Sequence, residues 1–331
     1  MKFGLLCERH VSESGTEDCI SGGVKWQCYL AKELLRRGHE FHFFLRIPNR
    51  PKWFDTTGIH YHPRDEVFNH TGDVLLAPWR ITSEYLQHER LKQQWKKRIL
   101  VLHDAETALN HNAALEGDHY IMSVSSMLAS IASTYMRVTA KNPIEHRILP
   151  NWVPCGVNPD IFNICNRTSG YSYTYPIIGI IGVQDENRVG DYRGIDICKQ
   201  IADKLVVKNS NITIKYFTGK TEQKMADHYK SVHYLLELPL LAGCPTSVIE
   251  AMACGTIPIT TYAGTTDIIN NMINGVLLPK INIDYSVNTI INFLTEDVYE
   301  MNHTQMLRQL RYTDFSWSRM TDKFLENLEY C

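Results

Sequence analysis

Short apolar segments alternate with amphipathic segments along most of the chain, and this alternation predicts an α/β fold built on parallel sheets. Residues 24–35 carry apolar side chains at helical spacing from Val24 to Leu35, and Gly38 is placed to end that helix. The apolar runs predict strands at residues 3–7, 40–45, 58–62, 73–77, 99–103 and 119–124 in the first half, and at 177–181, 211–217, 233–238, 256–260 and 275–278 in the second.

These two sets of strands predict two doubly wound sheets and therefore two domains. Residues 163–175 between the sets are polar, contain Gly, Ser and Tyr, and lack helical periodicity, which favours a linker. We expect an N-terminal Rossmann-like domain over residues 1–165, a C-terminal Rossmann-like domain over 166–312, and a C-terminal helix in 313–331 that packs on the N-terminal domain. Open α/β sheets bind ligands at the carboxyl ends of their strands, so the polar loops there are the candidate site.

Composition narrows the classes of partner. The chain has 331 residues, is 44% hydrophobic and has a formal net charge of −2, so it is not a polyelectrolyte partner for nucleic acid as a whole, although a local patch stays open. The short apolar run at the N-terminus and the lack of an 18-residue apolar stretch favour a cytoplasmic protein. The nine cysteines show no Cys-x-x-Cys or Cys/His metal spacing, which predicts reduced core thiols and no metal site.

Residues 243–278 (GCPTSVIEAMACGTIPITTYAGTTDIINNMINGVLL) hold the densest candidate chemistry. Thr246 or Ser247 is a candidate cap of a short helix that has Glu250 in its first turn and that Gly255 ends; TIPIT then predicts a strand, and AGTTD a tight turn that opens a helix. Helix N-termini and glycine turns expose N–H groups to a diphosphate, and a carboxylate accepts hydrogen bonds from a ribose diol. Alternatively, Ser247-x-x-Glu250 fits a capping box in which Glu250 bonds the backbone of Ser247.

This segment resembles the donor-binding signature of the retaining family-4 glycosyltransferases of GT-B architecture, through Glu250, AMACG, Pro258, Gly264-Thr265-Thr266 and Asn274-Gly275. Further blocks resemble the family in the same order along nearly the whole chain: SGGVKWQCYLAKELLRRGHEFHFF, ILVLHD, VPCGVNPDIF, IIGIIG with YRGID, and FSWSRM. The resemblance implies two Rossmann-like domains that face each other across a cleft. It also implies a hexosyl- or pentosyltransferase that moves a sugar from a UDP- or GDP-sugar to a hydroxyl group of a glycan or glycolipid, with retention and without a metal or other cofactor.

The resemblance also implies roles for single residues. The Gly22-Gly23 loop and Gly182 approach the donor phosphates, although Gly22-Gly23 also fits a plain strand-to-helix turn. The Gly264-Thr265-Thr266 turn binds the donor. His103, at the end of the strand 99–103, lies near the transferred sugar.

Two arginines are the predicted cations of the diphosphate site. Arg193 precedes Gly194 where the family carries a Lys-Gly pair, and a cation there stabilises the leaving nucleoside diphosphate. Arg188 is the candidate for the second cation, or else a solvated loop charge. The chain contains no Asp-x-Asp, so we expect metal-independent stabilisation of the leaving group.

The chain departs from the family pattern at Ala242, where the family commonly has its first glutamate beside the donor sugar. Either another acid, with Glu237 the nearest, takes this role, or the donor sugar differs, or the activity is weakened. The last alternative would make the chain a catalytically degenerate protein that binds a nucleotide sugar.

The acceptor side offers one charged feature, the segment LKQQWKKR at residues 91–98. Its four cations are predicted at the end of a helix, where the helix dipole alone favours them. The alternatives are peripheral contact with an anionic membrane surface, as expected for a glycolipid acceptor, or contact with nucleic acid, as expected for a transferase that acts on modified bases. The cations are Lys92, Lys96, Lys97 and Arg98.

Overall fold

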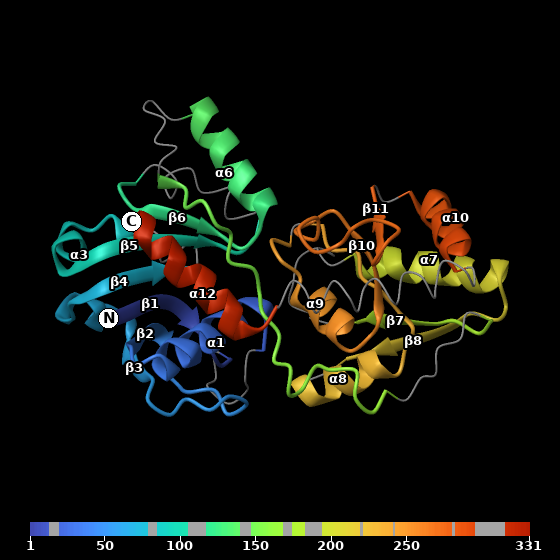
Figure 1. The fold of residues 1–331 in the computed structure, drawn as a ribbon, viewed down its shortest axis with the longest axis horizontal. Helices are drawn as coiled ribbons and strands as arrows, with labels where there is room; N and C mark the ends of the chain where they lie inside the picture. The colour runs from blue at the N-terminus through green and yellow to red at the C-terminus, as the bar shows by residue number, and fades with distance from the viewer. Residues whose placement is uncertain are drawn as a thin grey trace. The chain divides into compact units, whose positions relative to one another are not determined.

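Two parallel sheets, each in its own unit, organise the computed structural model of the chain (Figure 1). Unit 1 comprises residues 1–156 and 317–331, and unit 2 comprises residues 157–316. Among the described residues, no helix combines the length and apolarity that crossing a membrane requires. The structure describes residues 1–12, 20–78, 85–104, 117–139, 147–167, 174–182, 194–218, 221–240, 242–279, 282–294 and 315–331.

Unit 1 contains a six-stranded parallel sheet with the strand order β3-β2-β1-β4-β5-β6. Its strands overlap the six predicted segments, and apolar side chains such as Phe3, Leu5 and Phe43 lie in the core with no exposed surface. The strands are β1 (Lys2–Arg9), β2 (Glu40–Ile47), β3 (His60–Pro63), β4 (Gly72–Ala77), β5 (Trp95–Leu102) and β6 (Tyr120–Ser123). The helices are α1 (Gly22–Arg36), η1 (Arg64–Asn69), α3 (Glu89–Gln94), α6 (Ser126–Thr139), α12 (Trp317–Asn327) and η3 (Leu328–Tyr330).

Helix α1 starts earlier than predicted. Ser21 is its N-cap, and the Ser21 Oγ accepts a hydrogen bond from the N–H of Val24 at 3.3 Å. Gly22 and Gly23 therefore lie in the first helical turn, and the prediction that they form a loop before the helix is wrong. Gly38, at φ +80°, follows the C-cap as predicted.

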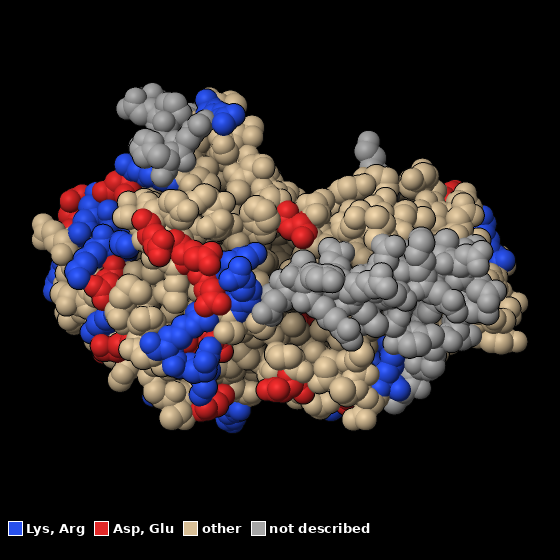
Figure 2. Space-filling view, in the orientation of Figure 1, with Lys and Arg blue, Asp and Glu red and all other residues tan. Residues whose placement is uncertain are grey.

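The basic segment at residues 91–98 changes from helix to strand in its middle, so the prediction that its cations end a helix is wrong for three of the four. α3 ends at Gln94 because the buried ring of Trp95 fills the space above Gly4 and Gly72, where added Cβ atoms would lie 2.5 and 2.2 Å from that ring. On the face of unit 1 drawn in Figure 2, basic and acidic side chains alternate. The partners are Glu89 for Lys92 (2.7 Å), Asp73 for Lys96 (2.7 Å), the Leu328 carbonyl for Lys97 (2.6 Å) and Asp118 for Arg98 (3.0 Å).

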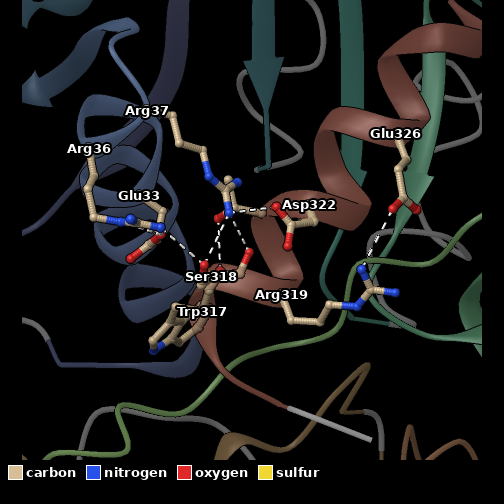
Figure 3. A network of polar contacts seen from close by, with 9 residues as sticks. Glu33, Arg36, Arg37, Trp317, Ser318, Arg319, Asp322 and Glu326 are labelled. Carbon is tan, nitrogen blue, oxygen red and sulfur yellow. Dashed lines mark hydrogen bonds and ion pairs between the residues drawn. The ribbon is translucent and has the colours of Figure 1, made fainter.

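Helix α12 belongs to unit 1 and lies beside α1 (Figures 1 and 3). The Trp317 ring stacks on Tyr29 with 4.9 Å between centroids and 5° between planes. The Arg37 guanidinium donates to the Ser318 carbonyl and pairs with Asp322, both at 2.7 Å (Figure 3). The FSWSRM block therefore anchors the C-terminal helix on unit 1.

Unit 2 contains a five-stranded parallel sheet with the order β11-β10-β9-β7-β8. β7 has β8 on one side and β9 on the other, so the chain changes direction across the sheet at β7 and β9, and such a switch point is where open α/β sheets bind ligands. All five predicted strands are present. They are β7 (Ile177–Ile181), β8 (Thr213–Phe217), β9 (Tyr234–Leu236), β10 (Ile257–Thr261) and β11 (Val276–Leu278), with helices α7 (Ile195–Lys208), α8 (Glu222–Lys230), α9 (Thr246–Ala253) and α10 (Ile283–Phe293).

The chain passes between the units earlier than the predicted boundary at residue 165. The change comes between Gly156 and Val157. Arg167 already packs in unit 2, where its guanidinium donates to the Cys254 carbonyl at 2.9 Å and to the Thr256 hydroxyl at 3.1 Å. Residues 168–173 of the predicted linker lie outside the described residues.

Candidate functional site

The loop after β9 and the start of α7 meet in unit 2 through a glycine. Gly194 is the N-cap of α7 and has a left-handed backbone with φ +67°. A Cβ at Gly194 would lie 2.3 Å from the Leu238 carbonyl oxygen. Only glycine permits both the left-handed backbone and this approach, so the α7 N-terminus is fixed against the carboxyl end of β9.

The turn after β10 packs on the same loop through a second glycine. Gly264 has φ +65°, and a Cβ there would lie 2.1 Å from the Gly243 carbonyl oxygen. The predicted helix after this turn is absent from the described residues. The carbonyl of Thr265 accepts hydrogen bonds from the N–H groups of Ile268 and Ile269, which close a single turn.

The Gly264-Thr265-Thr266 turn presents its backbone rather than its side chains. Thr265 is fully buried, and its hydroxyl donates to the Thr261 carbonyl. Within the described part of the chain, the N–H groups of these three residues have no hydrogen-bond acceptor. Unpaired N–H groups at such a turn suit an anionic ligand.

Glu250 lies on α9, in its second turn. The N-cap is Pro245 and the helix begins at Thr246, so Glu250 is not in the first turn as predicted. Ser247 lies inside the helix and is not its N-cap, so the predicted capping box between Ser247 and Glu250 does not form. The Glu250 carboxylate is 4% exposed and accepts a hydrogen bond from the Tyr229 hydroxyl at 3.4 Å. Burial, with Glu250 and Glu237 nearby, raises the pKa of Tyr229 well above its ordinary value, so this hydroxyl remains the donor.

A second buried carboxylate lies at the N-terminus of α9. Glu237 directly follows β9, is 7% exposed, and accepts a hydrogen bond from the hydroxyl of Ser247. Ser247 is in the first turn of α9, whose partial positive charge stabilises the Glu237 carboxylate. The nearby Ala242 has no group that could replace this acid, and its carbonyl oxygen would lie 2.7 Å from a Cβ added at Gly264.

His103 follows β5 in unit 1. Its Nε2 is buried and has no hydrogen-bond partner among the described residues. The ring lies edge-on to Trp26 with 4.8 Å between centroids. Burial lowers the pKa of His103 to about 4, against the opposite effect of Asp104, so the imidazole is neutral at pH 7. A neutral ring with an unpaired buried nitrogen is suited to a polar ligand.

The remaining predicted phosphate contacts are described only in part. A Cβ at Gly23 or Gly182 would meet nothing within 4 Å, so a ligand could approach either backbone closely. Arg188 and Arg193 lie outside the described residues. Sequence reasoning missed Tyr229 as the partner of Glu250 and Ser247 as the partner of Glu237, because both contacts join segments that are distant in sequence or separated by a loop.

The comparisons with known proteins concern the fold and the segment at residues 190–296. Residues 190–296 match the family model described as glycosyl transferases group 1. Similar solved structures include sucrose-phosphate synthase from Thermosynechococcus elongatus, with 15% identity and a TM-score of 0.71, covering 99% of this chain and 98% of that chain. They also include Anabaena HepE in complex with UDP-glucose, with 11% identity, a TM-score of 0.67 and complete coverage (100%) of both chains. The lipopolysaccharide outer core galactosyltransferase WaaB has 14% identity and a TM-score of 0.66, covering 99% of each chain. No curated protein matches the sequence.

At these identities the solved structures show the fold. They confirm the prediction of two Rossmann-like α/β domains of the GT-B class. The matched residues 190–296 contain Gly194, Glu237, Glu250 and the turn at Gly264. The match of this segment to the group 1 model, in a chain with the GT-B fold, supports a glycosyltransferase enzyme.

Proposed function

We propose that the protein is a retaining, family-4 glycosyltransferase that transfers a sugar from a UDP- or GDP-sugar to a hydroxyl group of a glycan or glycolipid. The observation that carries this proposal is that the α7 N-terminus and the Gly264 turn both pack on the loop after β9. This loop leads directly into α9, which carries the buried Glu250. A cytoplasmic location stays a prediction from the sequence.

The nucleotide half of the donor has a matching set of groups in unit 2. The Glu250 carboxylate would accept hydrogen bonds from the two ribose hydroxyls. The N–H groups of the Gly264-Thr265-Thr266 turn and of the α7 N-terminus would receive the diphosphate. HepE binds UDP-glucose with the same fold, which supports a UDP-sugar as the first donor to test.

The transfer step needs stabilisation of the departing diphosphate. As the bond between the anomeric carbon and the diphosphate oxygen breaks, negative charge grows on that oxygen, and Arg193 with Arg188 would offset this charge without a metal. His103 would contact a hydroxyl of the transferred sugar through Nε2. Contacts of His103 and Gly22-Gly23 with the donor are proposed from the family resemblance, since these residues belong to unit 1.

Glu237 is the proposed substitute for the acid that Ala242 lacks. Its carboxylate is buried, fixed by Ser247 and adjacent to the loop that contains Ala242. The absence of a carboxylate at Ala242 is also the observation that favours a second candidate function, a nucleotide-sugar-binding protein without transferase activity.

The experiment incubates the purified protein with a panel of UDP- and GDP-sugars, with and without glycan and glycolipid acceptors, and follows the free nucleoside diphosphate. Release that depends on the acceptor, together with an α-linked product from an α-linked donor, supports retaining transfer. Release without acceptor indicates a hydrolase, and binding without release favours the second candidate.

Arg193→Ala tests the leaving-group role. We expect kcat to fall about tenfold to a thousandfold, the scale of losing one oriented electrostatic contact, and Arg193→Lys to recover part of it. Lys199→Ala is the matched control, because Lys199 is exposed on the following helix and pairs only weakly with Asp196 at 3.7 Å. A kcat for Arg193→Ala within twofold of the control would remove Arg193 from the mechanism.

A further inference from the structure

Three histidines, His42, His62 and His70, form a cluster in unit 1 that is unrelated to the candidate donor site. The parallel register pairs His42 with His60 and Phe44 with His62, which brings His42 and His62 to one face of β2 and β3. η1 packs on this face, and its C-cap is His70. The side chain of His42 is 5% exposed and that of His62 is 20% exposed, so the histidine cluster is mostly shielded from water.

The nitrogen atoms of His42 and His62 are arranged in a specific way. His42 Nδ1 lies 2.9 Å from His62 Nε2. The other nitrogen of each ring faces a carboxylate, with His42 Nε2 at 2.6 Å from Glu40 and His62 Nδ1 at 3.2 Å from Glu66. A carboxylate only accepts hydrogen bonds, so both outer nitrogens carry the ring protons. The two inner nitrogens then direct lone pairs at each other, and a cation between them would relieve this repulsion.

The surroundings of His42 and His70 disfavour protonation of these two rings. Burial lowers the pKa of His42 to about 4 and also lowers the pKa of His70. Lys2 on β1 and His60 on β3 add to this effect at His42, and only Glu40 opposes it. The imidazoles of His42 and His70 are therefore neutral at pH 7, which is the form of the side chain that binds metal ions.

We propose that His42, His62 and His70 bind a divalent transition-metal ion, with Zn²⁺ the best fit. The candidate ligand nitrogens of the histidine cluster lie within 4.8 Å of one another. Tetrahedral Zn²⁺, with Zn–N distances of about 2.0–2.1 Å, separates two ligand nitrogens by about 3.3 Å, so the inner nitrogens need to part only slightly. Glu40 and Glu66 would orient the first two rings through their outer N–H groups, as carboxylates commonly do behind metal-bound histidines.

The place of the histidine cluster indicates a structural metal. β3 is the edge strand of the sheet, with β2 as its neighbour, and an ion bound by His42, His62 and His70 would tie β2, β3 and the end of η1 together. His42 lies near the amino end of β2, whereas His103 follows the carboxyl end of a strand. The sequence predicts no metal site, because the ligands are spread over residues 42–70 in no short motif and only the pairing of β2 with β3 brings them together.

The test uses the tag-free full chain after removal of metals with a chelator. We expect calorimetry and elemental analysis to find one Zn²⁺ per chain at the histidine cluster, and the melting temperature of the zinc-loaded protein to exceed that of the metal-free protein. His62→Gln and His70→Gln should each weaken Zn²⁺ binding at least about tenfold and abolish the thermal shift, and Glu40→Gln and Glu66→Gln should weaken binding about tenfold to a hundredfold.

His228→Gln in unit 2 is the matched control, because its ring stacks on Phe217 away from any histidine partner in the described part of the chain. It should bind Zn²⁺ as the wild type does. Circular dichroism of each metal-free variant checks that it is folded. The proposal is overturned if the wild type binds no stoichiometric Zn²⁺, or if His62→Gln and His70→Gln bind it as the control does. Zn²⁺ binding that survives both variants but is lost when the thiols are alkylated would assign the metal to cysteines and would also overturn the proposal.

Discussion

The two units have the same kind of sheet but bury different titratable side chains. Among the described residues, unit 1 buries three imidazoles, those of His10, His42 and His119, and no carboxylate. Unit 2 buries one imidazole, that of His233, and three carboxylates, those of Glu222, Glu237 and Glu250. The fold accommodates either chemistry, so the architecture alone does not assign a role to a unit. The side chains at the strand ends assign that role.

This difference shows how each unit is stabilised. In unit 2, backbone contacts at Gly194 and Gly264 fix the loops that hold the buried carboxylates, as a binding site for a polar ligand requires. In unit 1, neutral imidazoles are packed against aromatic rings, as His10 is against Phe43 with 4.5 Å between centroids. The stability of unit 1 should therefore depend on pH through its histidines. The stability of unit 2 should depend on a bound ligand through its carboxylates.

Acidification is expected to have the largest effect, and to act on unit 1. Burial lowers the pKa of His10 and of His103 to about 4, below the ordinary value of 6.5. The unfolded chain thus binds more protons between these values, and stability that is complete above pH 6.5 is lost as the pH falls toward 4. For the fully buried His10 alone the loss is on the order of 3 kcal/mol, and His103 adds a loss of the same order. Amide hydrogen exchange at pH 7 and pH 5, corrected for intrinsic rates, should show unit 1 losing protection first. Earlier loss in unit 2 would contradict the comparison.

Removing the anchor of α12 tests unit 1 without touching its histidines. Trp317→Ala deletes a ring that is 6% exposed and stacked on Tyr29, which should reduce the free energy of unfolding of unit 1 by about 3–5 kcal/mol. Trp152→Ala is the control, because Trp152 is 36% exposed and should cost less than about 1 kcal/mol. Urea unfolding followed by circular dichroism measures both. Equal losses would show that Trp317 is not an anchor.

The glycine contacts of unit 2 are tested by Gly264→Ala. The left-handed backbone alone costs about 1–2 kcal/mol with alanine, and the added Cβ would collide with the Gly243 carbonyl. We expect unit 2 to lose at least that much stability and to bind UDP or GDP more weakly. Gly182→Ala, where a Cβ meets nothing within 4 Å, should keep the stability of the wild type. If Gly264→Ala has the melting temperature of Gly182→Ala and the nucleotide affinity of the wild type, the turn is not held as described.

The smallest effect is expected at the basic segment of unit 1. Lys96 is 77% exposed and pairs with Asp73, so Lys96→Ala should change the free energy of unfolding by less than about 0.5 kcal/mol. Binding to anionic vesicles and to RNA should be the same as for the wild type in flotation and gel-shift assays. If Lys96→Ala binds vesicles or RNA more weakly than the wild type, the predicted contact with a membrane or with nucleic acid is supported.

Most strands could be predicted from the sequence because they are short apolar runs that must be buried. The edge strands β3 and β8 are the exceptions, since most of their side chains are half-buried or exposed. The helix at residues 246–253 and the turn at Gly264 were found for a similar reason, since one contiguous segment carries their glycines and carboxylate. Local pattern did not predict that α1 starts at the Ser21 cap or that Trp95 turns a helix into a strand, because a side-chain cap and a tertiary contact decide these bounds.

The partners of the site residues could not be predicted in the same way. The Tyr229 hydroxyl reaches Glu250 from another helix, and the pairing of β2 with β3 brings His42 to His62. Both contacts depend on the packing of elements and on strand register, which a single sequence does not state.

The central claim, that Glu250 binds the ribose of a nucleotide donor, is tested most directly by calorimetric titration of UDP and GDP into the wild type, Glu250→Ala and Tyr229→Phe. If Glu250 accepts both ribose hydroxyls, Glu250→Ala should weaken binding by about 1.5–3 kcal/mol, or roughly tenfold to over a hundredfold, while the protein stays folded. Tyr229→Phe removes the internal partner at 3.4 Å but leaves the carboxylate, so it should bind the nucleotide nearly as the wild type does. If Glu250→Ala and Tyr229→Phe both lower the melting temperature and both leave nucleotide affinity unchanged, Glu250 is a structural partner of Tyr229 and the claim is contradicted.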